Sequence, residues 1–279
     1  MKGILSNWVY FVWSCVYVLL LWVILGCTLY GFLWSLGIYA VSIAVALSPL
    51  GESLMRKLEN VKPIVTNKEK ERLLPLFHEV YQNALKETPS LSKNIELCIS
   101  NDMTVNAFAF GSNTVVLNRG TIESMSDEEI KGVLAHEFGH LAHHDTKALL
   151  INVIGNGLFS LVIMIINGII TAYNIITNLF RPGHDSIWIM SLLQGLINFI
   201  VTVIMGFGSI ILSANSRQNE FHADNYASKI GYRENLISAL YFLSKLDMGG
   251  KISFKNRMKM SHPYINERIG RLENEQLTA

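Results

Sequence analysis

Two histidines and a glutamate lie within one turn of a predicted helix. The segment from His136 to His140 reads H-E-x-x-H, with Glu137 in second place, and the run 127–142 contains no proline. Residues four apart share one face of an α-helix, so both imidazoles can bind one metal ion. Glu137, rotated by about 100°, can flank that ion without binding it. This donor set suits Zn²⁺ with one open coordination position.

A metal site needs more than this motif, which arises by chance in about one chain in a hundred of this composition. Glu220 supplies the missing oxygen ligand, and Asp224 lies on the same helix face, where it can accept a hydrogen bond from a bound imidazole. Asp145 can orient another histidine in the same way. The alternative is two solvated helices, but the combination with H-E-x-x-H favours a metal centre.

The composition indicates a membrane protein. Of 279 residues, 50% are hydrophobic and 16% are charged, against about 25% charged in average soluble proteins. The net charge of +1 gives no indication of a nucleic-acid partner. Cys15, Cys27 and Cys98 form no C-x-x-C pair, so they predict neither a disulfide framework nor a metal site and fit a reducing compartment.

Four apolar stretches predict about four transmembrane helices. No Asp, Glu, Lys or Arg occurs within 3–51, which suits two spans of about 20 residues each; we expect them at 8–25 and 29–47. The uncharged runs 148–180 and 186–216 predict two more. A signal peptide is the alternative for the first stretch, which is several times too long for one.

Basic residues follow the second span and set the expected orientation. By the positive-inside tendency, they place this side of the membrane in the cytosol. These residues are Arg56, Lys57, Lys62 and Lys68.

A small mixed sheet is expected before the H-E-x-x-H helix. Strands are predicted at 95–100, 105–110 and 114–117, with a hairpin turn at 111–113. An exposed edge strand can pair with an extended substrate and bring its amide to the metal; an ordinary core hairpin is the alternative. The candidate substrate-binding residues are Asn106, Ala107, Phe108, Ala109 and Phe110.

These residues, in this order and spacing, resemble the HtpX-like membrane zinc metalloproteases, relatives of the CAAX prenyl endopeptidases. The resemblance implies one Zn²⁺ per subunit, held by His136, His140 and Glu220, with Glu137 as the catalytic base. It further implies a multi-pass protein of the bacterial cytoplasmic (inner) membrane whose active site faces the cytosol. The implied role is quality control and stress response, with membrane proteins and unfolded polypeptides as substrates, the lipid bilayer as a partner, and an oligomer allowed.

A C-terminal segment offers further catalytic candidates. His262, between Ser261 and Pro263, precedes a short predicted helix that contains Arg268. We assign His262 as a candidate donor to the oxyanion, with Arg268 orienting it or the substrate carbonyl, and Asp224 as a supporting residue. A simple turn before a helix explains His262 equally well.

The expected fold is an α-helical membrane protein with a cytosolic α+β zincin-type metalloprotease domain that carries a small β-sheet. A two-helix transmembrane hairpin (1–50) precedes the first catalytic part with the substrate strands and the H-E-x-x-H helix (51–147). Two further spans (148–214) precede the second catalytic part with the third ligand (215–279). Because both ligand segments adjoin spans, we expect the active site at the cytosolic membrane boundary.

Three competing readings remain open from the sequence. A non-catalytic polytopic scaffold or transporter with an incidental H-E-x-x-H is the main alternative, but its spans would be expected to carry charges, and these spans carry none. An inactive metal-binding relative is disfavoured by the intact Glu137. A periplasmic active site requires an inverted topology.

Overall fold

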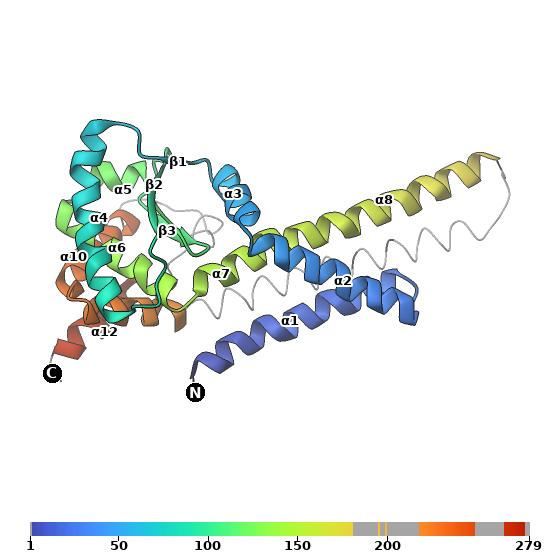
Figure 1. Ribbon diagram of the computed structural model, residues 1–279, viewed down its shortest axis with the longest axis horizontal. Coiled ribbons are helices and arrows are strands. Elements are labelled where there is room, and N and C mark those ends of the chain that lie inside the picture. The colour runs from blue at the N-terminus through green and yellow to red at the C-terminus, as the bar shows by residue number, and fades with distance from the viewer. Residues whose placement is uncertain (1, 181–194, 196–198, 200–217, 249–264, 277–279) are drawn as a thin grey trace. The chain divides into compact units, whose positions relative to one another are not determined.

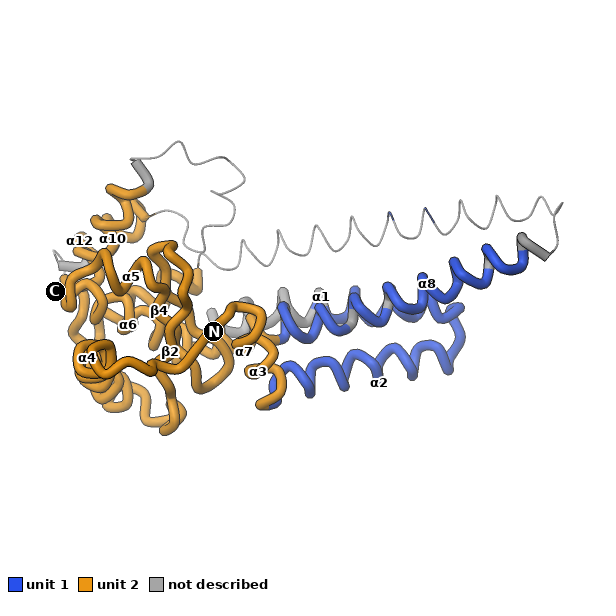
Figure 2. The backbone as a smooth tube through the Cα atoms, turned by 90° about the horizontal axis from the view of Figure 1, so that it is seen from above, with its two compact units in different colours: residues 1–48, 151–215 blue, residues 49–150, 216–279 orange. Residues whose placement is uncertain are grey.

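The chain is described here by a computed structural model that covers residues 2–180, 195, 199, 218–248 and 265–276 (Figure 1). It divides into two compact units, each assembled from two separate stretches of chain (Figure 2). The first unit holds residues 1–48 and 151–215, and the second holds residues 49–150 and 216–279.

The first unit consists of long apolar helices. They are α1 (Lys2–Ile24), α2 (Leu29–Ala46), a π-helical turn η1 (Ile151–Gly155) and α8 (Asn156–Phe180). The predicted turn between α1 and α2 is present, with Gly26 at φ +86° and Cys27 at φ +56°. The Tyr39 hydroxyl of α2 donates to Ser14 of α1 at 2.7 Å, which satisfies polar groups between two apolar helices.

Two helical stretches among the described residues are long and apolar enough to cross a membrane. They are Leu29–Ala46 and Asp145–Thr177, the second of which joins α7, η1 and α8. Within α1, the apolar stretch Ser14–Ile24 is shorter. The expected span at 186–216 lies outside the described residues except for positions 195 and 199. Four spans therefore stay a prediction.

A four-stranded mixed sheet lies in the second unit. Its strands are β1 (Val61–Pro63), β2 (Glu96–Ser100), β3 (Ala107–Phe110) and β4 (Thr114–Asn118), in the order β1-β2-β4-β3. β2 and β4 are parallel, and the other pairs are antiparallel. The three predicted strands and the hairpin turn are confirmed, β1 was not expected, and β3 is an end strand.

Helices make up most of the second unit. α6 begins after Ser126, whose capping box with Glu129 is formed in full. The helices are α3 (Pro49–Leu58), α4 (Asn67–Glu87), α5 (Arg119–Ser124), α6 (Asp127–Ala142), α7 (Asp145–Leu150), residues 218–229, α10 (Arg233–Met248) and α12 (Ile265–Gln276).

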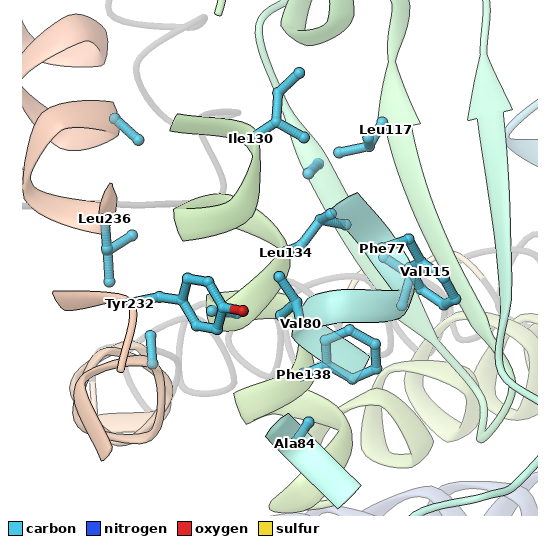
Figure 3. Close-up of a cluster of buried hydrophobic side chains, with 14 of the residues drawn as sticks. Phe77, Val80, Ala84, Val115, Leu117, Ile130, Leu134, Phe138, Tyr232 and Leu236 are labelled. Carbon is cyan, nitrogen blue, oxygen red and sulfur yellow. The ribbon is translucent and has the colours of Figure 1, made fainter. Parts of the chain in front are cut away.

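The core of the second unit surrounds α6. Phe138 is fully buried, and the centre of its ring lies 5.5 Å from that of Phe77 on α4 (Figure 3). The Tyr81 ring of the same helix lies 5.4 Å from it. Ile130 and Leu134 are equally buried on α6. Each such side chain contributes about 1.5–3 kcal/mol on burial. This packing gives the H-E-x-x-H residues a rigid support.

Candidate metal centre

Three metal-binding side chains from two helices converge in the second unit. The Nε2 atoms of His136 and His140 lie 3.2 Å apart on α6. The Glu220 carboxylate, from helix 218–229, lies 3.4 Å from His136 Nε2 and 3.5 Å from His140 Nε2. This is the one His/Cys/Asp/Glu group of metal-binding geometry among the described residues.

The spacing of these donor atoms fits a tetrahedral metal ion. An ion with bonds of about 2.0–2.1 Å holds its ligand atoms about 3.3–3.4 Å apart. The distance between the two imidazole nitrogens, and the shortest distance from each of them to the Glu220 carboxylate, lie close to this value. His136 Nε2 is nearest to Glu220 Oε2, and His140 Nε2 is nearest to Oε1. His136 and Glu220 are buried, so few waters compete for the ion. The residues present therefore fit the metal that the motif implies.

Small residues allow the two ligand-bearing helices to approach. A Cβ atom at Gly139 would lie 2.7 Å from Ala223 Cα and 2.9 Å from Ala223 O, closer than real contacts allow. On α6, one Cβ at Gly132 would likewise meet backbone atoms of Asn235 and Leu236 in α10 at 2.4 Å. Gly132 and Gly139 are thus the contact points of α6 with two neighbouring helices.

A carboxylate orients each ligating imidazole. His136 Nδ1 lies 2.9 Å from Asp224 Oδ1, and His140 Nδ1 lies 3.1 Å from Asp145 Oδ2. With Nδ1–H donating to a carboxylate, each ring turns its Nε2 toward Glu220, so Nε2 is the nitrogen that can bind a metal once it has lost its proton. The geometry thus brings together both carboxylates that the sequence had assigned to this role.

Arg268 reaches the centre from α12 and is almost wholly enclosed, with 2% of its surface exposed. Its Nε and Nη2 atoms donate to the two Asp224 oxygens at 2.8 and 2.6 Å, and Nη1 lies 3.0 Å from Glu220 Oε2. Nη2 also lies 3.2 Å from His136 Nδ1, but that nitrogen donates to Asp224, so this contact is packing. Arg268 therefore fixes the third ligand and the carboxylate behind His136.

The electrostatics of the centre favour a positive charge. Burial alone lowers the pKa of His140, but Asp145, Glu220 and Glu137 outweigh it and raise the pKa to about 10. Burial opposes ionisation of Asp224, yet His136 and Arg268 bring its pKa below the usual value. A pocket that holds a proton so firmly on a histidine will also attract a metal cation.

Glu137 lies beside this cluster and is also buried, with 2% of its surface exposed. Its charge acts on both His140 and Arg268, which places the carboxylate within electrostatic range of the ligands. It makes no part of the His136–His140–Glu220 group. A buried, non-ligating carboxylate next to the ion is what a general base requires.

The candidate substrate strand β3 lies next to α6, against which it packs. The side chains of Ala107 and Ala109 are buried, and that of Phe108 is half-buried. Phe110 is fully buried and stacks on Phe108 with ring centroids 6.1 Å apart. The ring of Phe110 therefore belongs to the core.

One site residue predicted from the sequence has no described position. His262 lies in 249–264, outside the described residues, so its role at the oxyanion stays a prediction.

Thr121 and Thr146 were not expected, yet their hydroxyls bond to the carbonyls at the two ends of β3. No local motif marks either threonine, because each bond joins residues far apart in the chain.

Comparison with known proteins places these features in context. Residues 69–276 match the family described as Peptidase family M48. The Protease HtpX homolog of Bacillus subtilis (strain 168) is 26% identical over 265 residues, which cover 87% of this chain and 81% of the relative. Protease HtpX of Aeromonas hydrophila subsp. hydrophila is 33% identical over 199 residues, covering 63% and 66%.

A solved structure shares the fold. The crystal structure of S. mikatae Ste24p aligns with a TM-score of 0.52 at 23% identity. The alignment covers 86% of this chain and 58% of that one. At this identity the likeness concerns the fold alone.

Proposed function

This chain belongs to peptidase family M48 and is a metalloprotease, and from that premise we propose that it is a zinc-dependent endopeptidase of the membrane. The observation that carries the proposal is the buried His136–His140–Glu220 cluster with Glu137 beside it. One Zn²⁺ per subunit is the ion favoured by two imidazoles and a carboxylate at tetrahedral spacing. Among the described residues, this buried cluster favours a protease over a non-catalytic scaffold or transporter.

The residues of the chain divide the chemistry between them. When bound, zinc supplies Lewis acidity, which acidifies a water molecule and polarises the scissile carbonyl. Glu137 accepts the proton of the attacking water and passes it to the leaving amine. Asp145 and Asp224 hold the two imidazoles in their ligating tautomer, and Arg268 holds Glu220. His262 is the proposed donor to the developing oxyanion.

We infer the cellular setting from the apolar helices and the charges that follow them. Two helical stretches can cross a membrane, and the basic residues after α2 favour a cytosolic position for the second unit. We propose a multi-pass protein of the bacterial cytoplasmic membrane that cleaves misfolded or surplus membrane proteins near the inner membrane surface. This role in quality control and stress response is supported by the resemblance to the HtpX-like proteases.

Replacing Glu137 by Gln tests the proposal. The amide has the same shape but cannot accept a proton, so hydrolysis should fall by at least about 10²-fold, while the three ligands stay in place. The measurement combines zinc content per subunit with cleavage of an unfolded protein such as casein by the purified membrane enzyme. Cleavage products from membranes holding wild type or the Glu137→Gln variant would identify natural substrates.

Glu128→Gln is the matched control, because Glu128 lies on the same helix, is exposed, and pairs with Lys131 at 3.0 Å. It should retain both zinc and activity. A zinc-loaded Glu137→Gln protein that still cleaved substrate at the wild-type rate would remove Glu137 as the base. A wild-type protein without zinc-dependent cleavage would overturn the proposed function itself.

A further inference from the structure

Two buried threonine hydroxyls hold the backbone at the two ends of β3. Thr121 Oγ1, on α5, donates to Asn106 O at 2.6 Å, just before the strand. Thr146 Oγ1, on α7, donates to Gly111 O at 2.6 Å, just after it. The two threonines are 1% and 3% exposed, so water hardly competes for either bond.

The pairing of β3 with β4 decides which backbone groups point outward. Asn118 N donates to Asn106 O at 3.0 Å, which marks these two residues as a hydrogen-bonded pair. Bonded and non-bonded pairs alternate along an antiparallel ladder. In the observed register, the backbones of Phe108 and Phe110 therefore bond to β4. The N–H and C=O groups of Ala107 and Ala109 point away from β4, and none of the described residues bonds to them. We call these groups the free edge.

Gly111 is the next residue of this alternating series, and Thr146 takes both of its outward groups. The Gly111 N–H donates to Thr146 O at 3.3 Å, and the Gly111 C=O accepts from the Thr146 hydroxyl. Thr146 thus bonds to Gly111 at the place where a further strand residue would pair. The free edge therefore stops after Ala109.

The turn beyond this stop is fixed as well. Glu52 Oε1, from α3, accepts a hydrogen bond from Ser112 N at 2.9 Å. Gly111 has φ +66°, and a Cβ atom there would lie 2.1 Å from Glu52 Oε1. The positive φ therefore favours glycine here, and the bond to Glu52 holds the turn next to α3.

The first residues of α7 also contact the metal centre. Asp145, the neighbour of Thr146, holds His140 Nδ1 at 3.1 Å. Adjacent residues at the start of α7 thus fix a metal ligand and the end of the free edge. This connection gives the edge a defined position along the direction in which a substrate would extend past the metal.

Resting on the proposed protease function, we propose that Thr146 ends the substrate-binding edge, so that a substrate backbone pairs with Ala107 and Ala109 and no further. Thr121 and Thr146 are positioning residues that hold this edge in register with the metal centre. The ligand is an extended polypeptide added as a further strand, recognised through its backbone and not through its side chains.

Backbone N-methylation of a peptide substrate tests where the edge stops. Each N-methyl group removes one amide donor, so a scan along a cleaved peptide of about ten residues reports which amides pair with the strand. For wild type, two alternate amides on one side of the scissile bond should be sensitive, each raising KM about three- to tenfold. The next amide of the alternating series, beyond the one that pairs with Ala109, should be insensitive. Sensitivity at that third position, or at none, would overturn the proposal.

Threonine variants test the positioning role. Thr146→Val and Thr121→Val each remove one hydroxyl of the pair, so KM for the unmodified peptide should rise at least about threefold, while kcat changes less than twofold. Thr146→Ser and Thr121→Ser should restore the wild-type KM. Thr88→Val is the control, because its hydroxyl bonds to Tyr226 at 3.2 Å, away from β3. Equal KM values for the Val and wild-type proteins would contradict the positioning role.

Hydrogen exchange separates this inference from the proposed function, because it needs no substrate. In the zinc-loaded full-length protein, the bonded amides of Phe108, Phe110 and Gly111 should exchange at least about tenfold faster in Thr146→Val than in wild type or Thr146→Ser. Unchanged exchange would reject the hold on the strand even if proteolysis is normal. Faster exchange in a protein that cleaves nothing would reject the proposed function and leave the hold on the strand standing.

Discussion

At the scale of single residues, the carboxylates behind the histidines decide how the metal centre responds to protons. Asp145 and Asp224 each accept from one Nδ1–H, and Arg268 balances the charge of Asp224 and Glu220. These groups orient the imidazoles, and they also stabilise positive charge on them. Protons and metal ions therefore compete for the same nitrogens.

Zinc affinity should consequently depend steeply on pH. The pKa of His140 is raised to about 10, so at neutral pH the metal-free protein carries a proton on this ring. Only the unprotonated ring binds metal, so affinity is lost as pH falls below that pKa. From pH 6 to 9, the dissociation constant should fall about tenfold per pH unit. Competition against a chromophoric chelator measures it.

Calorimetry in buffers of different ionisation enthalpy provides the matching count. About one proton or more should be released per zinc bound at pH 7. Asp145→Asn weakens the hydrogen bond that does most to raise this pKa, so the same release should move to lower pH. A zinc affinity that does not change between pH 6 and 9 would contradict the assigned environment of His140.

At the scale of elements, the centre depends on how closely α6 and helix 218–229 pack. Gly139 lies inside the H-E-x-x-H motif, but its role is to touch the backbone of Ala223, one residue before Asp224. The motif thus carries both the metal chemistry and the helix contact. Ala223 is fully buried at this contact.

A methyl group at position 139 should therefore weaken metal binding more than folding. Gly139→Ala places a Cβ atom 2.7 Å from Ala223 Cα, so helix 218–229 must move and carry Glu220 away from the imidazoles. Zinc affinity should fall about 10- to 100-fold, the range typical of displaced supporting groups. Zinc titration and thermal unfolding of the same preparation separate the two effects.

Gly270→Ala on α12 is the control, because nothing lies within 4 Å of a Cβ atom there. It should leave zinc affinity unchanged and stabilise the helix by about 0.5–1 kcal/mol. Wild-type zinc affinity in Gly139→Ala would show that the helix contact does not position Glu220.

At the scale of the whole molecule, each compact unit combines two distant segments of the chain. The ligands belong to residues 49–150 and 216–279, and the apolar helices belong to the other unit. A bound metal would therefore join the two segments of one unit. The stretch of chain between α6 and helix 218–229 passes through the other unit.

Removing zinc should therefore destabilise the second unit selectively. A ligand present at 1,000 times its dissociation constant stabilises the folded state by about 4 kcal/mol. In detergent, a chelator should lower the unfolding temperature of the ligand-bearing unit by several degrees. Scanning calorimetry of the full-length protein would record it.

Zinc-loaded Glu137→Gln should show the same shift, because its ligands are intact. His136→Ala should lack it, because one ligand is gone. A chelator that left every transition of wild type in place would argue against a metal that links the two segments.

Much of the chemistry was determined by the sequence alone, because it depends on short-range geometry. The spacing of His136 and His140 sets their common face in any α-helix, and the Ser126–Glu129 pair sets where that helix begins. Alternating residues likewise predicted β2, and the hairpin turn at 111–113 with its flanking residues predicted β3 and β4. Periodicity and capping act over a few residues, so they can be read without knowing the rest of the fold.

Only the tertiary structure decided how distant segments meet. The strand β1, the helices α3 and α5, the parallel pairing of β2 with β4, and the bidentate grip of Arg268 on Asp224 had no local signal. The same holds for Thr146 at the end of β3. Such contacts depend on the packing of many buried side chains at once, so no short stretch of sequence specifies which polar groups will be brought together.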